Sequence, residues 1–216
     1  MRSIWRTVPK DTALACAAVW LYGLSYGAIA VADGFPLWVP AAASMLVIAG
    51  SSELLFVGVV AAGGSPIAAA MAGVLVNARH LAYGLALPDG IVPSHGWRRL
   101  LGTHVMNDES VVFALAEPDL AAKRRAYWAC GLGVLVAWPS GAVLGGLVAS
   151  VVHNTDAFGL DAVFPAVILA LIAPALRERR TCVAALAGAA IALATTPFLP
   201  AGVPVLLALA AVVVAP

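Results

Sequence analysis

Apolar stretches as long as a lipid bilayer is thick constrain the fold of this chain more than any other feature. Four of them, at residues 12–32, 37–62, 66–87 and 126–152, reach the roughly 20 residues that a helix needs to cross the hydrocarbon core. Hydrophobic residues make up 62% of the 216 residues and charged residues 11%, against roughly 25% charged in soluble domains. We therefore expect an all-α fold, a polytopic integral membrane helical bundle.

Three shorter apolar segments follow, at residues 162–176, 182–196 and 203–215. Because they are short for a span, they require tilt, a locally thinner bilayer or protein neighbours such as a partner subunit. No polar or charge-rich stretch is long enough to be a linker, so we expect a single membrane domain over residues 1–216. It would hold about seven spanning or half-spanning segments, some of them discontinuous, with a kink at Pro139.

The amino-terminal segment resembles a signal peptide, because basic residues precede an apolar run that ends in Ala30-Val31-Ala32. Its length, close to that of a full span, favours a retained first helix instead. Arginine and lysine cluster at residues 2–10, 98–99, 123–125 and 177–180, and the positive-inside rule places these clusters in the cytoplasm. The amino terminus of this multi-pass protein would then be cytoplasmic.

The basic clusters do not fit a chain in which every long apolar run crosses once, because Arg98 and Arg99 would then lie outside. One solution is that residues 37–62 form two half-helices, broken at Gly50-Ser51-Ser52, that enter and leave on the same face. The other solution accepts one violation of the rule and lets residues 103–116 cross as well. The sequence leaves both solutions open.

The predicted break carries Glu53, an ionisable residue deep in an apolar run. Gly50 permits unusual backbone angles, and Ser51 and Ser52 can cap the half-helix that follows. Free amides at such a helix end would form a binding site for a substrate carboxylate, as the discontinuous helices of transporters do. The alternative is a simple kink in which Glu53 is satisfied by a neighbouring helix.

A second polar group lies in residues 66–87, where Asn77, Arg79, His80 and Tyr83 fall on one helical face. Arg79 is too far from the end of its segment to reach water easily, so we expect a substrate contact or an ion pair with Glu53, Asp108 or Glu109. His80 is a candidate proton carrier, with a hydrogen-bonded core histidine as the alternative.

Adjacent carboxylates at Asp108 and Glu109 form the third polar group. They are typical of a solvated loop, but the apolar run at residues 111–116 favours a place in the membrane beside Arg79. Together with Glu53 and His80 they are the candidates for proton or ion coupling. The candidates for substrate binding are Gly50, Ser51, Ser52, Glu53, Asn77, Arg79 and Tyr83.

Several other functions find little support in the sequence. The net charge of +1, with no broad basic face, argues against nucleic-acid binding. Cys16, Cys130 and Cys182 occur singly, so we expect packed thiols and neither a metal site, a cofactor nor a disulfide. Residues 23–27 fit the G-x-S-x-G pattern of serine hydrolases, which leaves an intramembrane hydrolase pairing Ser25 with His80 as an alternative. Because these glycines lie in a span, as do Gly141 and Gly145, a small-xxx-small packing face explains them better.

Three successive segments carry a family resemblance: Ala-Gly-Ser-Ser-Glu at 49–53, Ala-Ala-Gly-Gly-Ser-Pro at 61–66 and Val-Asn-Ala-Arg-His-Leu-Ala-Tyr-Gly at 76–84. In order and spacing they resemble the signatures of the AzlC family, the large subunit of bacterial branched-chain amino acid exporters. Residues 107–110, 159–166 and 199–202 resemble its later motifs. Glu53 stands where the family pattern has Gln, and Asn107 where it has Thr.

The resemblance implies a transporter, and not an enzyme, that exports hydrophobic amino acids with the proton gradient or the membrane potential. It also implies a partner, a small AzlD-type membrane subunit. A zwitterion with an aliphatic side chain needs a cation, an acid or carbonyl group and an apolar pocket, which Arg79, Glu53 and the break at Gly50 could supply. A structural membrane subunit without transport activity is the remaining alternative, while a channel would require a repeated ring of polar groups.

Overall fold

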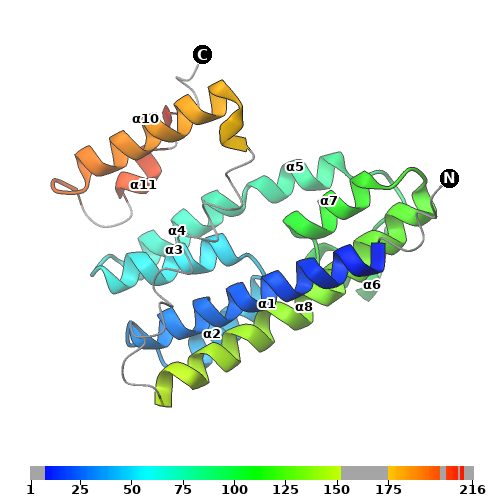
Figure 1. Ribbon diagram of the computed structural model, residues 1–216, viewed down its shortest axis with the longest axis horizontal. Coiled ribbons are helices and arrows are strands. Elements are labelled where there is room, and N and C mark those ends of the chain that lie inside the picture. The colour runs from blue at the N-terminus through cyan, green and yellow to red at the C-terminus, as the bar shows by residue number, and fades with distance from the viewer. Residues whose placement is uncertain (1–7, 152–174, 200–202, 209, 212–216) are drawn as a thin grey trace.

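The computed structural model describes residues 8–151, 175–199, 203–208, 210 and 211, and every regular element in these ranges is a helix. Figure 1 shows their arrangement. The helices are α1 Val8–Ala32, α2 Trp38–Leu46, α3 Gly50–Ala61, α4 Pro66–Asn77, α5 Arg79–Ala86, α6 Trp97–His104, α7 Asp108–Ala116, α8 Leu120–Val151, the short 3-10 helix η3 Ala175–Arg177, α10 Arg179–Thr195 and α11 Val203–Ala208.

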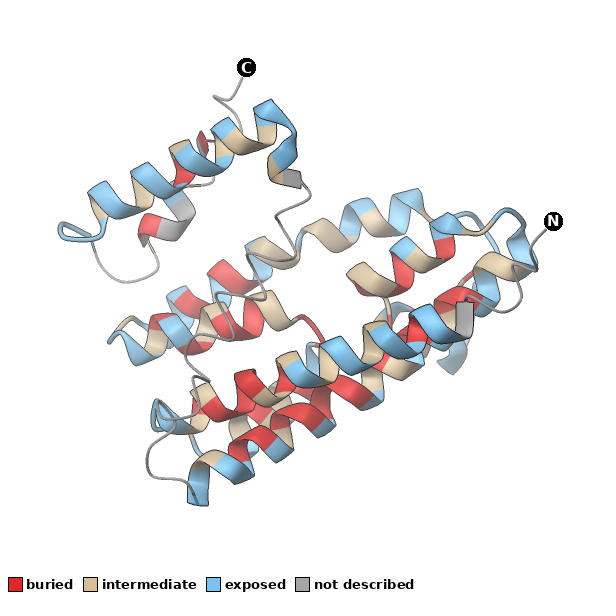
Figure 2. Ribbon diagram, viewed as in Figure 1, coloured by how far each residue is buried: buried red, intermediate tan, exposed pale blue. Residues whose placement is uncertain are grey.

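The all-α membrane fold predicted from the sequence is confirmed. Residues Lys10–Ala32 and Leu120–Val151 form helices long and apolar enough to cross a bilayer. Large apolar side chains point outward from them, among them Leu14 (70% exposed) and Val136 (69% exposed), and Figure 2 shows exposed residues along the outer faces of both helices. Such a surface suits contact with lipid, because helices satisfy their own backbone hydrogen bonds.

Glycines join α1 to α8, as the small-xxx-small pattern predicts. A Cβ atom on Gly27 would lie 1.8 Å from the Ala142 carbonyl oxygen, and one on Gly145 would lie 1.9 Å from the Leu24 carbonyl oxygen. Gly23 and Gly141 approach the opposite backbone in the same way. The two long helices therefore touch backbone to backbone, and because later residues of α1 meet later residues of α8, they run parallel.

The run 37–62 is a hairpin of two half-helices, α2 and α3, that begins and ends at the same end of the bundle (Figure 1). Leu37, before α2, approaches Gly146, and Phe56 in α3 returns to within 6.3 Å of Phe35, measured between ring centroids. The re-entrant solution is therefore the one adopted. The break lies at residues 47–49, slightly before the predicted position, and Ile48 takes the left-handed angle there (φ 50°).

The run 66–87, expected as one helix, is also broken, with α4 and α5 separated at Ala78. Figure 1 shows the pair running the length of the bundle, from the end with Phe35 back to the end with Lys10. The loop that follows reaches the start of α8, where Gly90 lies next to Leu120. Residues 98–99 and 123–125 therefore share one end with Lys10, which resolves the conflict with the positive-inside rule.

Residues 97–116 form a second hairpin, α6 and α7, that enters from the Lys10 end. The Tyr127 hydroxyl donates to the Gly102 carbonyl (2.7 Å), and the Val105 backbone packs on Gly131, so α6 runs inward beside α8. α7 then runs outward, since the Lys123 ammonium donates to the Leu115 carbonyl (3.3 Å). The second solution, in which residues 103–116 cross, is wrong, because these residues turn back at positions 105–107.

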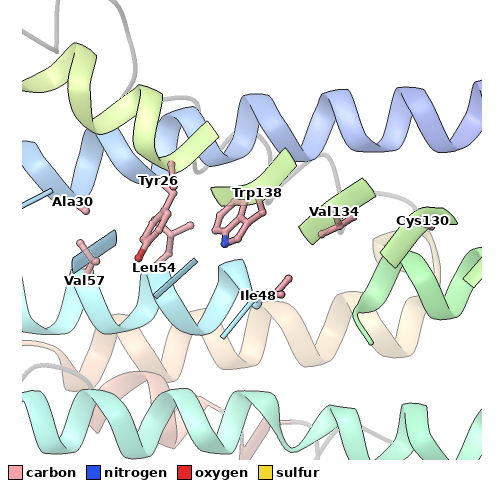
Figure 3. Packing of buried hydrophobic residues seen from close by; sticks show 9 residues of the cluster. Tyr26, Ala30, Ile48, Leu54, Val57, Cys130, Val134 and Trp138 are labelled. Atoms are coloured by element: carbon pink, nitrogen blue, oxygen red, sulfur yellow. The ribbon is translucent and has the colours of Figure 1, made fainter. Parts of the chain in front are cut away.

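The main core lies between α1, α3 and α8. Figure 3 shows Tyr26 and Trp138 beside Leu54 and Val57 of α3, and all four side chains are at most 5% exposed. Cys16, Cys130 and Cys182 are free thiols, as expected. α8 continues through Pro139, and the kink there stays a prediction. The motif at 159–166, the segment 162–174 and residues 200–202 lie outside the described residues.

Candidate functional site

The site includes the start of α3, which begins at Gly50 after Ala49. Its capping differs from the one predicted. Gly50 is helical, and its role is to leave space: a Cβ atom there would lie 2.9 Å from the Trp138 ring and 3.0 Å from the Tyr22 ring. No side chain of Ser51 or Ser52 caps α3. The expected angular role of Gly50 and the expected serine caps are therefore wrong, because Ile48 makes the turn and another residue satisfies the helix end.

That residue is Glu53, which is 4% exposed and lies in the first turn of α3. Its Oε1 atom accepts from the Ala49 backbone N–H and from the Trp138 indole N–H, both at 3.0 Å. The Tyr26 hydroxyl is a further hydrogen-bond partner, and the Tyr26 and Trp138 rings stack 5.2 Å apart. Glu53 thus faces α1 and α8, on a different side of α3 from the two serines.

Arg79 joins the two hairpins. One guanidinium nitrogen, Nη2, donates to Ser51 Oγ at the start of α3 (2.9 Å), and the other, Nη1, lies 3.0 Å from Asp108 Oδ2 at the start of α7. The Arg79 side chain is 33% exposed and that of Asp108 43% exposed. Of the ion pairs expected for Arg79, the structure contains the one with Asp108.

The break between α4 and α5 places three further predicted residues around this ion pair. The Asn77 side-chain amide donates to Ser52 Oγ (3.0 Å), and the Tyr83 hydroxyl donates to Asp108 Oδ1. His80 Nδ1 lies 2.9 Å from the Asn77 carbonyl oxygen, with its ring edge-on to Tyr83. The structure therefore brings Ser51, Ser52, Asn77, Arg79, Tyr83 and Asp108 together, with His80 beside them.

The second half-helix, α7, has a reciprocal cap. Asn107 Oδ1 accepts from the Ser110 backbone N–H (2.8 Å), and Ser110 Oγ accepts from the Asn107 backbone N–H (2.9 Å). This cap is a variant of the capping box, with serine in the place usual for glutamate. It places Asp108 and Glu109 in the first turn of α7, where the helix dipole favours negative charge.

Several buried polar atoms around Arg79 have no hydrogen-bond partner within the protein. They are Asn77 Oδ1, Arg79 Nε and Asn107 Nδ2. A buried polar atom without a partner costs free energy, so such atoms mark places where a water molecule or a ligand group can bind. Two donors and one acceptor suit a molecule that carries both a carboxylate and an ammonium group.

The arrangement places groups that favour an anion beside a group that favours a cation. The amino-terminal ends of α3 and α7 and the Arg79 guanidinium favour an anion, while Asp108 can balance a cation. Within the described ranges, no three His, Cys, Asp or Glu side chains gather as a metal site would require.

Four residues that shape the candidate site were not predicted from the sequence. Trp138 and Tyr26 bind Glu53, the Asn107 side chain caps α7, and His104 Nε2 lies 2.9 Å from the Met45 carbonyl at the tip of the first hairpin. Only Asn107 has a sequence signal, since an Asn three residues before Ser precedes an apolar run.

Ser25 does not have the surroundings of a hydrolase nucleophile. It lies inside the continuous helix α1 and is 1% exposed, whereas a nucleophile elbow is a sharp turn between a strand and a helix. The G-x-S-x-G match is therefore explained by helix packing through Gly23 and Gly27.

Known proteins resemble this chain in sequence over most of its length. The AzlC protein family matches residues 15–152, which include most of α1, both hairpins and all of α8. The branched-chain amino acid transport protein AzlC of Bacillus subtilis (strain 168) is 27% identical over 176 residues, which cover 80% of this chain and 68% of that protein. No solved structure matches the chain. Since the family match extends over more than half of the sequence, this chain belongs to the AzlC family of membrane transport proteins.

Proposed function

We propose that this protein moves branched-chain or other hydrophobic amino acids across the inner membrane of a bacterium. The observation that carries the proposal is the position of Arg79, which contacts Ser51 at the start of α3 and Asp108 at the start of α7. A guanidinium between two helix amino termini, inside an otherwise apolar bundle, is suited to a carboxylate. The family relationship and the transport protein of Bacillus subtilis support the same role.

In the proposed complex, the substrate carboxylate binds the Arg79 guanidinium beside the start of α3. Its ammonium group takes the place of Arg79 beside Asp108, which Tyr83 already orients. Asn77 lies within the same group of contacts and has a free side-chain oxygen that can accept from the ammonium group. Glu53 is fully occupied by Ala49 and Trp138, so it acts on the substrate through the shape of the α3 end.

We further propose that transport is export, coupled to protons or to the membrane potential, in complex with a small AzlD-type subunit. Glu53, His80, Asp108 and Glu109 are the candidates for coupling. The starts of α1, α6 and α8, the helices that carry the basic residues Lys10, Arg98, Arg99 and 123–125, lie toward one end of the bundle (Figure 1), which supports a cytoplasmic amino terminus. A partner subunit would also cover the ion pair of Arg79 and Asp108, whose exposed fractions do not suit contact with lipid.

The test is counterflow of radiolabelled leucine, isoleucine, valine and methionine in membrane vesicles that contain this protein, with and without a small partner subunit. We expect saturable exchange of at least one of the four amino acids, and its loss in Arg79→Ala. A matched control is Asp89→Ala, which removes an exposed carboxylate far from the site. Equal counterflow with the protein and with empty vesicles, in the presence of the partner, would refute the proposal and favour a structural subunit.

A further inference from the structure

The two hairpins share one local plan, although their sequences differ. Each turns through three residues, and each second half-helix begins after a residue with nearly the same φ angle, −142° at Ala49 and −141° at Asn107. Three residues further on, Ser52 and Ser110 are both buried and both donate a hydroxyl hydrogen bond to that residue's carbonyl (2.9 and 3.1 Å). The breaks therefore share their length, this φ angle and the serine contact, but they differ in the ψ angle, 80° at Ala49 and 177° at Asn107, and only the second has a side-chain cap.

The two hairpins have opposite orientations along the bundle. The α2–α3 hairpin enters from the end with Phe35, and the α6–α7 hairpin enters from the end with Lys10 (Figure 1). Their tips meet near the middle, where His104 Nε2 contacts the Met45 carbonyl at 2.9 Å. Two similar hairpins of opposite orientation form an inverted pair, an arrangement that lets a transporter open to either side in turn.

Arg79 belongs to neither hairpin, since it begins α5 in the broken helix that runs the length of the bundle. Its two terminal nitrogens bind one hairpin each, Ser51 in the first and Asp108 in the second. These contacts and the contact of His104 with Met45 join the tips. We define the contacts of Arg79 with Ser51 and Asp108 as the tip latch.

We propose that the two hairpins are the moving parts of the transport cycle and that the tip latch holds them closed until a substrate carboxylate takes Asp108's place on Arg79. This inference rests on the proposed transport of amino acids. A carboxylate bound to Nη1 of Arg79 breaks the direct ion pair with Asp108, so that the α6–α7 hairpin is held to Arg79 only through the substrate, while the contact with Ser51 persists. Because the hairpins are inverted, separation of one tip opens the site toward one face only.

The inference predicts a change in the distance between the hairpins that can be measured without any transport. Spin labels would be placed on cysteines at Gly58 in α3 and Val112 in α7, both exposed, after replacement of Cys16, Cys130 and Cys182. Double electron–electron resonance spectroscopy of the purified protein then gives the distribution of distances between the two spin labels. The latch variant is Asp108→Ala, and the control is Asp89→Ala.

We expect one dominant distance in the unliganded parent and in Asp89→Ala, and a second, longer distance in Asp108→Ala. Saturating leucine should populate the longer distance in the parent, whereas leucinamide, which lacks a carboxylate, should not. The same single distance in Asp108→Ala as in the parent would overturn the latch, even if leucine is transported. If Asp108→Ala opens but no amino acid binds the parent, the latch stands and the proposed substrate is wrong.

Discussion

Replacement of Gly27 by alanine tests the packing on which the whole arrangement depends. A Cβ atom there would lie 1.8 Å from the Ala142 carbonyl oxygen and 2.6 Å from its carbon, both main-chain atoms that no side-chain rotation can move. Ordinary contact begins at 3.4 Å, so α1 and α8 must separate by about 1.6 Å at this point. Overpacking of this kind costs roughly 1–3 kcal/mol in folding free energy.

The matched control is Gly58→Ala, since Gly58 is also helical but has nothing within 4 Å of its Cβ position. Alanine favours a helix over glycine by about 0.5–1 kcal/mol, so the control should be neutral or stabilised. At 2–4 °C per kcal/mol, Gly27→Ala should lower the Tm of the detergent-solubilised protein by roughly 2–12 °C. The reasoning fails if Gly27→Ala melts at or above the Tm of Gly58→Ala, as measured by thiol-reactive dye unfolding.

Three further predictions concern the site and the topology. Arg79→Lys should lose most leucine counterflow while it still inserts into the membrane, because one ammonium group cannot hold two oxygens in the planar fork of a guanidinium; near-normal counterflow would remove the bidentate contact from the mechanism. Glu53→Gln should retain counterflow, because an amide oxygen can still accept from the Trp138 indole N–H, but it should lose pH-driven accumulation of leucine. Full accumulation would show that Glu53 is structural and would make Glu109 the next candidate for proton coupling. A cysteine at Gly64 should react with an impermeant maleimide from outside intact cells and one at Arg99 should not, whereas protection of Gly64 would contradict the re-entrant hairpin.

Much of the architecture could be predicted because the bilayer imposes simple lengths and costs. Apolar runs gave the membrane helices, and the conflict between Arg98, Arg99 and the positive-inside rule pointed to a re-entrant segment. Glycines four residues apart predicted a packing face on α1 and indicated the same spacing on α8, and the structure shows that these two faces meet. These inferences need only sequence separation and polarity.

The second hairpin and the break at Ala78 could not be predicted, because their causes lie in tertiary contacts. α6 is only 8 residues long and polar on average, so it does not resemble a membrane segment, and it is placed by Tyr127 and Gly131 of α8. The residues that make the two hairpins alike are Ser52 and Ser110. One shared residue type is too little sequence identity to reveal an internal repeat.

The candidate site was predicted in its membership more than in its geometry. Ser51, Asn77 and Arg79 were proposed from polarity at membrane depth, and they do lie together. Glu53 lies elsewhere, because its partner Trp138 is 85 residues away in the sequence and gives no local signal. Its role in coupling stays a prediction.

The central claim is that Arg79 holds the substrate carboxylate. Its most direct test is isothermal titration calorimetry of leucine and of leucinamide with the purified protein and its partner subunit. If Arg79 holds the substrate carboxylate, leucine binds to the parent protein and to Asp89→Ala, whereas leucinamide does not bind. Arg79→Ala should then lose leucine binding while its Tm stays close to that of the parent. Binding of leucine to Arg79→Ala with the Kd of the parent would contradict the account, as would equal binding of leucinamide and leucine.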